Sequence, residues 1–216
     1  MYDAVEDPYT YKNSTVLKNK LDLRNQAELD AFEAEISSAR AEEPLPEGTL
    51  DFKHYCAIHH HLFQDVYDWA GQPRTVRIAK GGNPFCFPEN IHDQATNLFE
   101  ELRQASHLRN LEAREFAHNA AHFLAELNAV HAFREGNGRS QLSFFALLAD
   151  NAGHPLNLDR LDPEEMLAAM IASFDGDEGK LAAVPGANSL TYPLARNSLR
   201  STLPVAVIGR EPANST

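Results

Sequence analysis

Residues 131–142 read HAFREGNGRSQL, and this stretch decides how the rest of the chain is interpreted. Gly136 and Gly138 stand two positions apart, although a glycine inside a helix costs about 1 kcal/mol relative to alanine. The two glycines therefore indicate a loop, or a place where the backbone approaches another group closely. His131 precedes the first glycine by five positions, so one ionisable ring stands at the entrance of this loop.

Apolar residues recur at helical spacing on both sides of the loop. They are Phe116, Ala120, Phe123, Leu124 and Leu127 before it, and Leu142, Phe145, Leu147 and Leu148 after it. We expect the first helix to end near Val130 and the second to begin around Arg139. The second helix should stop at NAGHP (residues 151–155), because a glycine followed by a proline is a helix-end signal.

The start of the second helix predicts an anion site, because free backbone N–H groups and the positive end of the helix dipole point into the loop. Gly136 and Gly138 let the backbone approach a phosphate. Asn137 offers a side-chain donor, and Arg139 can grip phosphate oxygens. The stretch lacks the lysine and the spacing of a P-loop, so that alternative is weak.

The remaining polar residues of the loop suggest chemistry at this anion. Glu135 can hold Mg²⁺, which often takes one protein carboxylate together with substrate phosphates. His131 changes protonation near neutral pH and can act as general base for an incoming hydroxyl. Phe133 should anchor the loop in the core. From this chemistry alone, a purely structural loop stays open as an alternative.

Three further helices and one hairpin are expected upstream. The helical stripes are Leu29, Phe32 and Ile36; Leu50, Tyr55, Ile58, Leu62, Val66 and Trp69; and Ile91, Leu98 and Leu102. Between the second and third stripes, Thr75–Ala79 and Phe85–Phe87 have β-type composition and flank KGGNP, which predicts a hairpin. Its outer edge would be open to pair with another chain. We interpret His59–His61 as partly exposed structural histidines.

Composition and charge limit the function classes. The chain has 216 residues, 43% of them hydrophobic, and a net charge of −12, which argues against binding nucleic acid through phosphate neutralisation. No apolar run approaches the ~18 residues that span a bilayer, and the N-terminus lacks the apolar core of a signal peptide. Two cysteines provide no disulfide framework, which fits a reducing cytoplasm. We interpret the acidic stretch 27–43 as a solvated helix face.

The loop and its surroundings resemble the Fic-domain family. HAFREGNGR (131–139) resembles the signature His-x-Phe-x-[Asp/Glu]-Gly-Asn-Gly-Arg-x-x-Arg, and LFQDVYDWAGQPRTVRI (62–78) resembles the stretch that leads into the hairpin called the flap. FAHNAAHFLAELNAVHAF (116–133) is similar to the motif-bearing helix, and DPYTYKNSTVLKNKL (7–21) to the N-terminal entry of bacterial members. The resemblance implies an all-α Fic fold with a small β-hairpin flap.

The resemblance also implies a domain plan. A Fic core would span residues 49–184, with the flap at 74–88 and the motif loop at 131–139. Residues 1–48 would form an N-terminal helical extension, and residues 185–216 a tail. A last core helix is expected after Asp162–Pro163, which supply an N-cap and a first-turn proline.

The implied activity is transfer of AMP from ATP to a Tyr, Ser or Thr hydroxyl of a target protein. By the resemblance, His131 is the base, Glu135 the Mg²⁺ ligand, and Arg139 the phosphate-binding arginine. The anion cradle comprises Gly136, Asn137 and Gly138. The flap residues expected to hold the target backbone as an added strand are Thr75, Val76, Arg77, Ile78, Ala79 and Lys80.

Leu142 is the main departure from the family pattern, because it stands where members have a second arginine that contacts the terminal phosphate. Losing a charge-assisted hydrogen bond of roughly 1.5–3 kcal/mol would weaken the enzyme on the order of 10- to 100-fold. Gly138 favours AMP transfer over the related phosphotransferases, which usually carry lysine there. A degenerate module that binds nucleotide or protein without transfer, or an enzyme for another phosphate-containing group, remains the alternative.

Regulation and setting follow from the resemblance. Members are often inhibited by a helix with [Ser/Thr]-x-x-x-Glu-[Gly/Asn], in cis or from a small antitoxin. SARAEE (38–43) and SFDGDEG (173–179) both fail this pattern, so we expect no built-in inhibitory helix. The protein would act in the cytoplasm, as the toxin of a toxin–antitoxin pair, or be delivered to a host cell as an effector.

Overall fold

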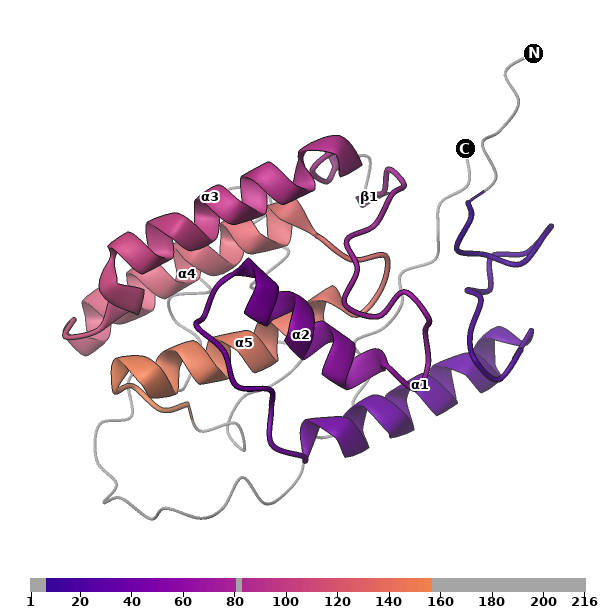
Figure 1. The fold of residues 1–216 in the computed structure, drawn as a ribbon, viewed down its shortest axis with the longest axis horizontal. Helices are drawn as coiled ribbons and strands as arrows, with labels where there is room; N and C mark the ends of the chain where they lie inside the picture. The colour runs from indigo at the N-terminus through magenta and orange to yellow at the C-terminus, as the bar shows by residue number, and fades with distance from the viewer. Residues whose placement is uncertain (1–6, 81–82, 157–216) are drawn as a thin grey trace.

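The computed structural model describes residues 7–80 and 83–156. This part of the chain is helical apart from one short hairpin (Figure 1). The elements in chain order are α1 (Gln26–Ala41), α2 (Phe52–Phe63), β1 (Ala79–Lys80), β2 (Asn83–Pro84), η1 (Pro88–Asn90), α3 (Ile91–Gln104), η2 (Ser106–Leu108), α4 (Ala113–Val130) and α5 (Asn137–Ala152).

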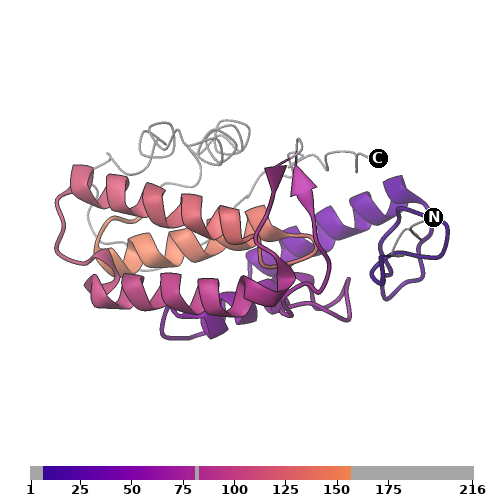
Figure 2. The ribbon, with the colours of Figure 1, turned by 90° about the horizontal axis from the view of Figure 1, so that it is seen from above.

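The helices α3, α4 and α5 run side by side, and α2 packs on α5 (Figures 1 and 2). The core between them is aromatic: Phe144 of α5 meets Tyr55, Phe99 and Phe123, which come from the other three helices. Each of these four rings is buried. Helix α1 lies outside this bundle and packs mainly on α2. The bundle therefore fixes the loop between α4 and α5, where the predicted site lies.

Local signals explain where several helices begin and end. The Asn25 side chain accepts hydrogen bonds from the backbone of Ala27 and Glu28, and Asp51 caps α2 in the same way through His54. Helix α5 ends at Gly153, which adopts a left-handed conformation with φ 87°. The predicted helix end at NAGHP is therefore confirmed.

Two predicted helix boundaries were wrong. Helix α2 ends at Phe63, and Val66 lies in the turns that follow, although its side chain is fully buried. The helical spacing of apolar residues continues past the end of α2 because the turns that follow also place apolar side chains in the core. Helix α5 begins at Asn137 and not around Arg139, since Gly136 already supplies the left-handed residue that starts the helix.

The hairpin exists, but its strands are shorter than predicted. They pair antiparallel with Ala79 opposite Pro84 and Lys80 opposite Asn83. Thr75–Ile78 and Phe85–Phe87 lie outside the strands. Next to the strands the Phe85 N–H still donates across the hairpin to Ile78, but the Cys86 N–H donates to Ala129 at the end of α4. The hairpin therefore stands beside the C-terminal end of α4 (Figure 2).

The predicted helix after Asp162–Pro163 and the tail 185–216 lie outside the described residues. Within residues 7–80 and 83–156, no helix is both long and apolar enough to cross a membrane.

Candidate active site

The motif loop connects α4 to α5 through two left-handed residues. His131 follows the last residue of α4 with φ 46° and ψ 62°, and its N–H donates to Leu127. Such a conformation costs a residue with a side chain of order 1–3 kcal/mol, so the surrounding structure must hold it in place. Gly136 at the other end has φ 80°, and a Cβ there would overlap the Phe63 ring. Glycine is therefore required at this position.

Asn137 closes the loop on itself. Its side-chain amide donates to the Phe133 carbonyl at 2.8 Å and its side-chain oxygen accepts from the Phe133 N–H at 2.9 Å. The residue is only 3% exposed. The side chain predicted as a phosphate donor is thus already bonded within the loop, which leaves the backbone N–H of Asn137 as its means of contacting an anion.

The predicted anion cradle corresponds to the backbone at the start of α5. Asn137, Gly138 and Arg139 occupy the first turn, whose N–H groups have no acceptor within a helix. Ser140 begins the regular pattern, since its N–H donates to the Gly136 carbonyl. The N–H of Gly136 donates to the Glu135 carboxylate at 3.0 Å.

A buried histidine of α2 packs against the motif loop and donates a hydrogen bond to it. His59 is fully buried in α2, and its ring stacks on Phe133 with centroids 3.8 Å apart. The Gly71 N–H donates to Nδ1, so Nε2 carries the proton and donates to the Glu135 carbonyl at 2.9 Å. Burial lowers the pKa of His59 to about 3, which keeps the ring neutral. The prediction of partly exposed histidines at 59–61 was therefore wrong for His59, whereas that of Phe133 as the loop's anchor is confirmed.

His131 lies against the hairpin. Its ring stacks on Phe85, with centroids 3.9 Å apart and planes 20° from parallel. Burial, together with the nearby positive charge of Arg74, lowers the pKa of His131 to about 3. A neutral imidazole is the form that can accept a proton from a hydroxyl.

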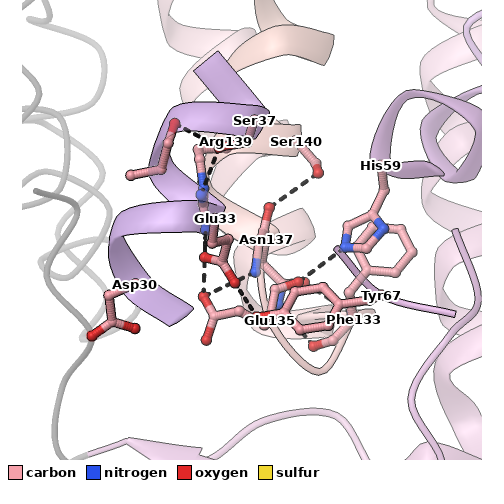
Figure 3. Close-up of polar contacts among 12 residues, drawn as sticks. Asp30, Glu33, Ser37, His59, Tyr67, Phe133, Glu135, Asn137, Arg139 and Ser140 are labelled. Atoms are coloured by element: carbon pink, nitrogen blue, oxygen red, sulfur yellow. Dashed lines mark hydrogen bonds and ion pairs between the residues drawn. The ribbon is translucent and has the colours of Figure 1, made fainter. Parts of the chain in front are cut away.

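Arg139 is held by α1 (Figure 3). Its Nη2 donates to the Glu33 carboxylate, and its Nη1 donates to Ser37 Oγ at 2.9 Å. The Tyr67 hydroxyl donates to the other oxygen of Glu33. The guanidinium also lies over the Phe63 ring, 4.6 Å from its centroid. Arg139 thus connects the start of α5 to the N-terminal helix α1.

Sequence reasoning missed this contribution from α1. Glu33 and Ser37 belong to the acidic stretch interpreted as a solvated face, yet they are only 4% and 3% exposed. Together with Leu29 they form a buried stripe spaced four residues apart. The four-residue spacing could have indicated a buried helix face. It was overlooked because the middle residue of the stripe is a glutamate, which is usually exposed.

Glu135 offers a carboxylate beside the start of α5. Its Oε1 accepts from Gly136 and lies 3.8 Å from Arg139 Nη2, and the side chain is about a quarter exposed. A partly exposed hard oxygen donor next to a phosphate cradle fits the preference of Mg²⁺ for carboxylate and phosphate ligands.

The predicted flap residues all lie in or just before the hairpin. Thr75 donates its N–H to the Tyr9 hydroxyl at 3.0 Å, which ties the N-terminal segment to the flap. Arg77 lies over the exposed Phe87 ring and pairs with Glu89. Leu142, at the position of the missing arginine, is partly buried and packs against the core.

The fold and the site together define a class: a helical bundle in which one loop carries a histidine at its entrance and an anion-binding helix start at its exit. The model of the Fic/DOC family matches residues 49–149. A relative from Sinorhizobium fredii, the probable protein adenylyltransferase y4lH, is 52% identical over 183 residues, or 84% of this chain and 95% of the relative. The probable protein adenylyltransferase Fic of Escherichia coli is 35% identical over 175 residues, or 79% and 86%.

A solved structure has the same fold. The Bartonella tribocorum effector protein BepC, crystallised with bound AMPPNP, superposes with a TM-score of 0.72 at 27% identity, over 81% of this chain and 92% of that chain. The chain belongs to the Fic/DOC family. The predicted family and the predicted all-α Fic fold with a small hairpin are confirmed.

Proposed function

We propose that this protein is a protein adenylyltransferase that transfers AMP from ATP to a Tyr, Ser or Thr hydroxyl of a target protein. One observation carries the proposal: His131 and the anion-binding start of α5 stand at the two ends of one loop that Asn137 holds closed. Similar proteins bear the name protein adenylyltransferase, and the similar BepC structure contains an ATP analogue.

The residues have distinct roles in this reaction. His131 accepts the proton of the target hydroxyl, whose oxygen forms a bond to the α-phosphorus of ATP. The bond from the α-phosphorus to the β-phosphate oxygen breaks, and pyrophosphate leaves. Arg139 and the first-turn N–H groups of α5, including that of Gly138, stabilise the negative charge on the phosphates.

Mg²⁺ would be held by Glu135 together with the phosphates and would neutralise their charge. Without Mg²⁺, Arg139 stands between two carboxylates, those of Glu33 and Glu135. The summed charge of these three side chains is therefore not positive. We therefore expect nucleotide binding to depend strongly on the divalent cation.

The hairpin is the proposed dock for the target. Ala79 and Lys80 form one strand, and an extended segment of the target could add to such an edge by backbone hydrogen bonds. Phe85 of the same hairpin touches His131, so a segment docked there lies near the base. An antitoxin partner and delivery to a host cell remain predictions.

The position of the isotope in ATP tests the proposed activity. The protein is incubated with Mg²⁺ and a bacterial lysate, using ATP labelled either at the α-phosphate or at the γ-phosphate. AMP transfer puts label on protein from α-labelled ATP only. Label from γ-labelled ATP would indicate phosphate transfer instead. Binding of ATP without label from either position would favour the alternative of a non-transferring module, to which Leu142 lends support.

A further inference from the structure

Arg74 is a fully charged group buried just before the hairpin. It is 2% exposed, and each hydrogen bond of its side chain in the described structure goes to a backbone carbonyl. Nε donates to His131 at 2.8 Å, and Nη1 donates to Val76 at 2.7 Å. Nη2 donates to Cys86 at 2.6 Å and, more weakly, to Val130 at 3.4 Å. A buried charge is costly unless it is paired or fully bonded, so this set of acceptors is what makes the position tolerable.

Two of these acceptors belong to the C-terminal end of α4. Val130 is the last residue of α4 and His131 follows it, so both carbonyls lie at the helix end, which has no donors for them and carries the negative end of the dipole. The guanidinium supplies both the missing donors and the opposite charge. Arg74 therefore caps the helix that presents the base.

The other two acceptors lie on the two arms of the hairpin. Val76 precedes β1 and Cys86 follows β2, so one guanidinium holds both arms at their base. Two backbone bonds reinforce this clamp: Arg74 N–H donates to Ala132 at 2.8 Å, and Cys86 N–H donates to Ala129 at 3.0 Å. Next to the clamp, the Phe85 ring lies on His131.

We propose that Arg74 is a positioning residue, which fixes the hairpin on the end of α4 at the separation that lets a hydroxyl docked on the hairpin meet the His131 imidazole. The docking of a target hydroxyl rests on the proposed function. The fixed distance between the hairpin and the end of α4 does not depend on it. The planar fork of arginine sends donors in three directions at once, and the single ammonium of lysine cannot reach all four carbonyls. A misplacement of about 1 Å between reacting groups can cost on the order of 100-fold in rate.

The variant Arg74→Lys keeps the charge and removes the fork. The matched control is Arg103→Lys, because Arg103 is exposed on α3 and pairs with Glu100 in the described part of the chain. With α-labelled ATP, we measure two products of each protein: label on lysate protein, and AMP released when water attacks instead. Water needs no hairpin to reach the phosphate.

We expect Arg74→Lys to reduce label on protein on the order of 10- to 100-fold while AMP release changes much less. The control should leave both unchanged. A purely structural role would reduce both products by the same factor, and that result would overturn the proposal.

A second readout needs no activity, so it separates failure of this inference from failure of the proposed function. The Phe85 ring, stacked on His131, shifts the NMR signals of the histidine ring protons, which His131→Gln identifies by their loss. In Arg74→Lys, with a thermal melt confirming a folded protein, we expect these signals to move toward the positions of an unstacked histidine. Unchanged signals would contradict the clamp.

Hydrogen exchange on the unmodified protein decides the question if the lysine variant does not fold. The Cys86 amide should exchange as slowly as the His131 amide, because the clamp joins the hairpin base to the end of α4. Exchange of Cys86 as fast as that of exposed amides would show that the hairpin opens independently, and the proposal would fail.

Discussion

Glu33 is buried on α1 and carries a formal charge, so its partners decide whether it stabilises the fold. One carboxylate oxygen faces Arg139 and the other accepts from Tyr67. Removing one partner of a buried ion pair leaves the other charge without compensation, which costs more than the pair itself contributes. The N-terminal helix is therefore connected to the nucleotide cradle by electrostatics as well as by apolar contact.

A double-mutant cycle measures this connection. Glu33→Gln and Arg139→Gln should each lower the free energy of unfolding by about 1–3 kcal/mol, because each leaves a buried partner unsatisfied. The double variant should be less destabilised than the sum by about 1 kcal/mol or more. Denaturant unfolding of the four proteins provides the values. Additivity within about 0.3–0.5 kcal/mol would show that the two side chains do not depend on each other.

Leu142 tests whether the missing second arginine limits nucleotide binding. Leu142 is partly buried on α5, so an arginine stem could follow the helix surface while its head reaches the cradle. We expect Leu142→Arg to tighten ATP binding on the order of 10-fold in the presence of Mg²⁺. Calorimetric titration gives the affinity, with Leu142→Met as a control of similar volume. A lower melting temperature without tighter binding would show that position 142 only packs.

At the scale of the elements, the start of α5 needs a glycine for two reasons: the left-handed backbone and the lack of room for a side chain. A pair of substitutions separates these two costs. Gly136 and Gly153 both have positive φ, 80° and 87°. A Cβ at Gly136 would meet the Phe63 ring, whereas nothing lies within 4 Å of one at Gly153. A substitution of Gly153 therefore measures the cost of the left-handed backbone alone.

We expect Gly153→Ala to lower the free energy of unfolding by about 1–2 kcal/mol. Gly136→Ala should cost about 1–3 kcal/mol more, because Phe63 must move, and should also weaken ATP binding as the cradle shifts. Denaturant unfolding and ATP titration of both variants check this. Equal stability and equal affinity of the two variants would mean that the loop accommodates a side chain.

The helices could be predicted from the sequence better than the hairpin, and the reason is physical. The period of apolar residues indicated α3 and α4, since each of these helices buries one face, and the glycine and proline of NAGHP indicated the end of α5. The strands of the hairpin are short because cross-strand bonding stops at the bond from the Phe85 N–H to the Ile78 carbonyl, and the Cys86 N–H donates instead to Ala129 at the end of α4. No sequence period records such a contact. The burial of Arg74 could not be predicted from the sequence either, because most arginines lie on the surface.

At the scale of the whole molecule, the motif loop was predictable because its chemistry lies in consecutive residues. The sequence-based prediction brought His131, Glu135 and Arg139 to one loop; the structure places His131 and Glu135 in the loop and Arg139 in the first turn of α5. The contributions of α1 and α2 to this site were not predictable, because Glu33 and His59 lie far from the motif in sequence. The division into an extension (1–48), a core (49–184) and a tail (185–216) stays a prediction.

Buried neutral histidines make the stability of the whole fold depend on pH. The pKa of His59 is about 3 in the folded protein and ordinarily about 6.5, so the unfolded chain binds more protons between these values. The stabilisation is complete above pH 6.5 and decreases as the pH falls below it. We expect a loss of about 1.2 kcal/mol from His59 between pH 6 and pH 5, where the unfolded histidine goes from roughly three-quarters to almost fully protonated.

Denaturant unfolding at several pH values measures this slope, and His59→Gln should make it smaller, because glutamine does not titrate. His131, with its own lowered pKa, would account for the slope that remains. Carboxyl groups contribute mainly below this range. The same slope in the wild-type protein and in His59→Gln would contradict the assignment of a buried neutral ring.

The proposed activity is tested most directly by removing the base and following both transfer and binding. His131→Ala is compared with the wild-type protein and with His92→Ala, an exposed histidine on α3. Label from α-labelled ATP on lysate protein and the affinity for an ATP analogue are measured for all three. We predict that His131→Ala lowers transfer on the order of 10²- to 10⁴-fold with affinity within about a factor of two, while His92→Ala changes neither. Transfer by His131→Ala at the wild-type rate would contradict the role of His131 as the base.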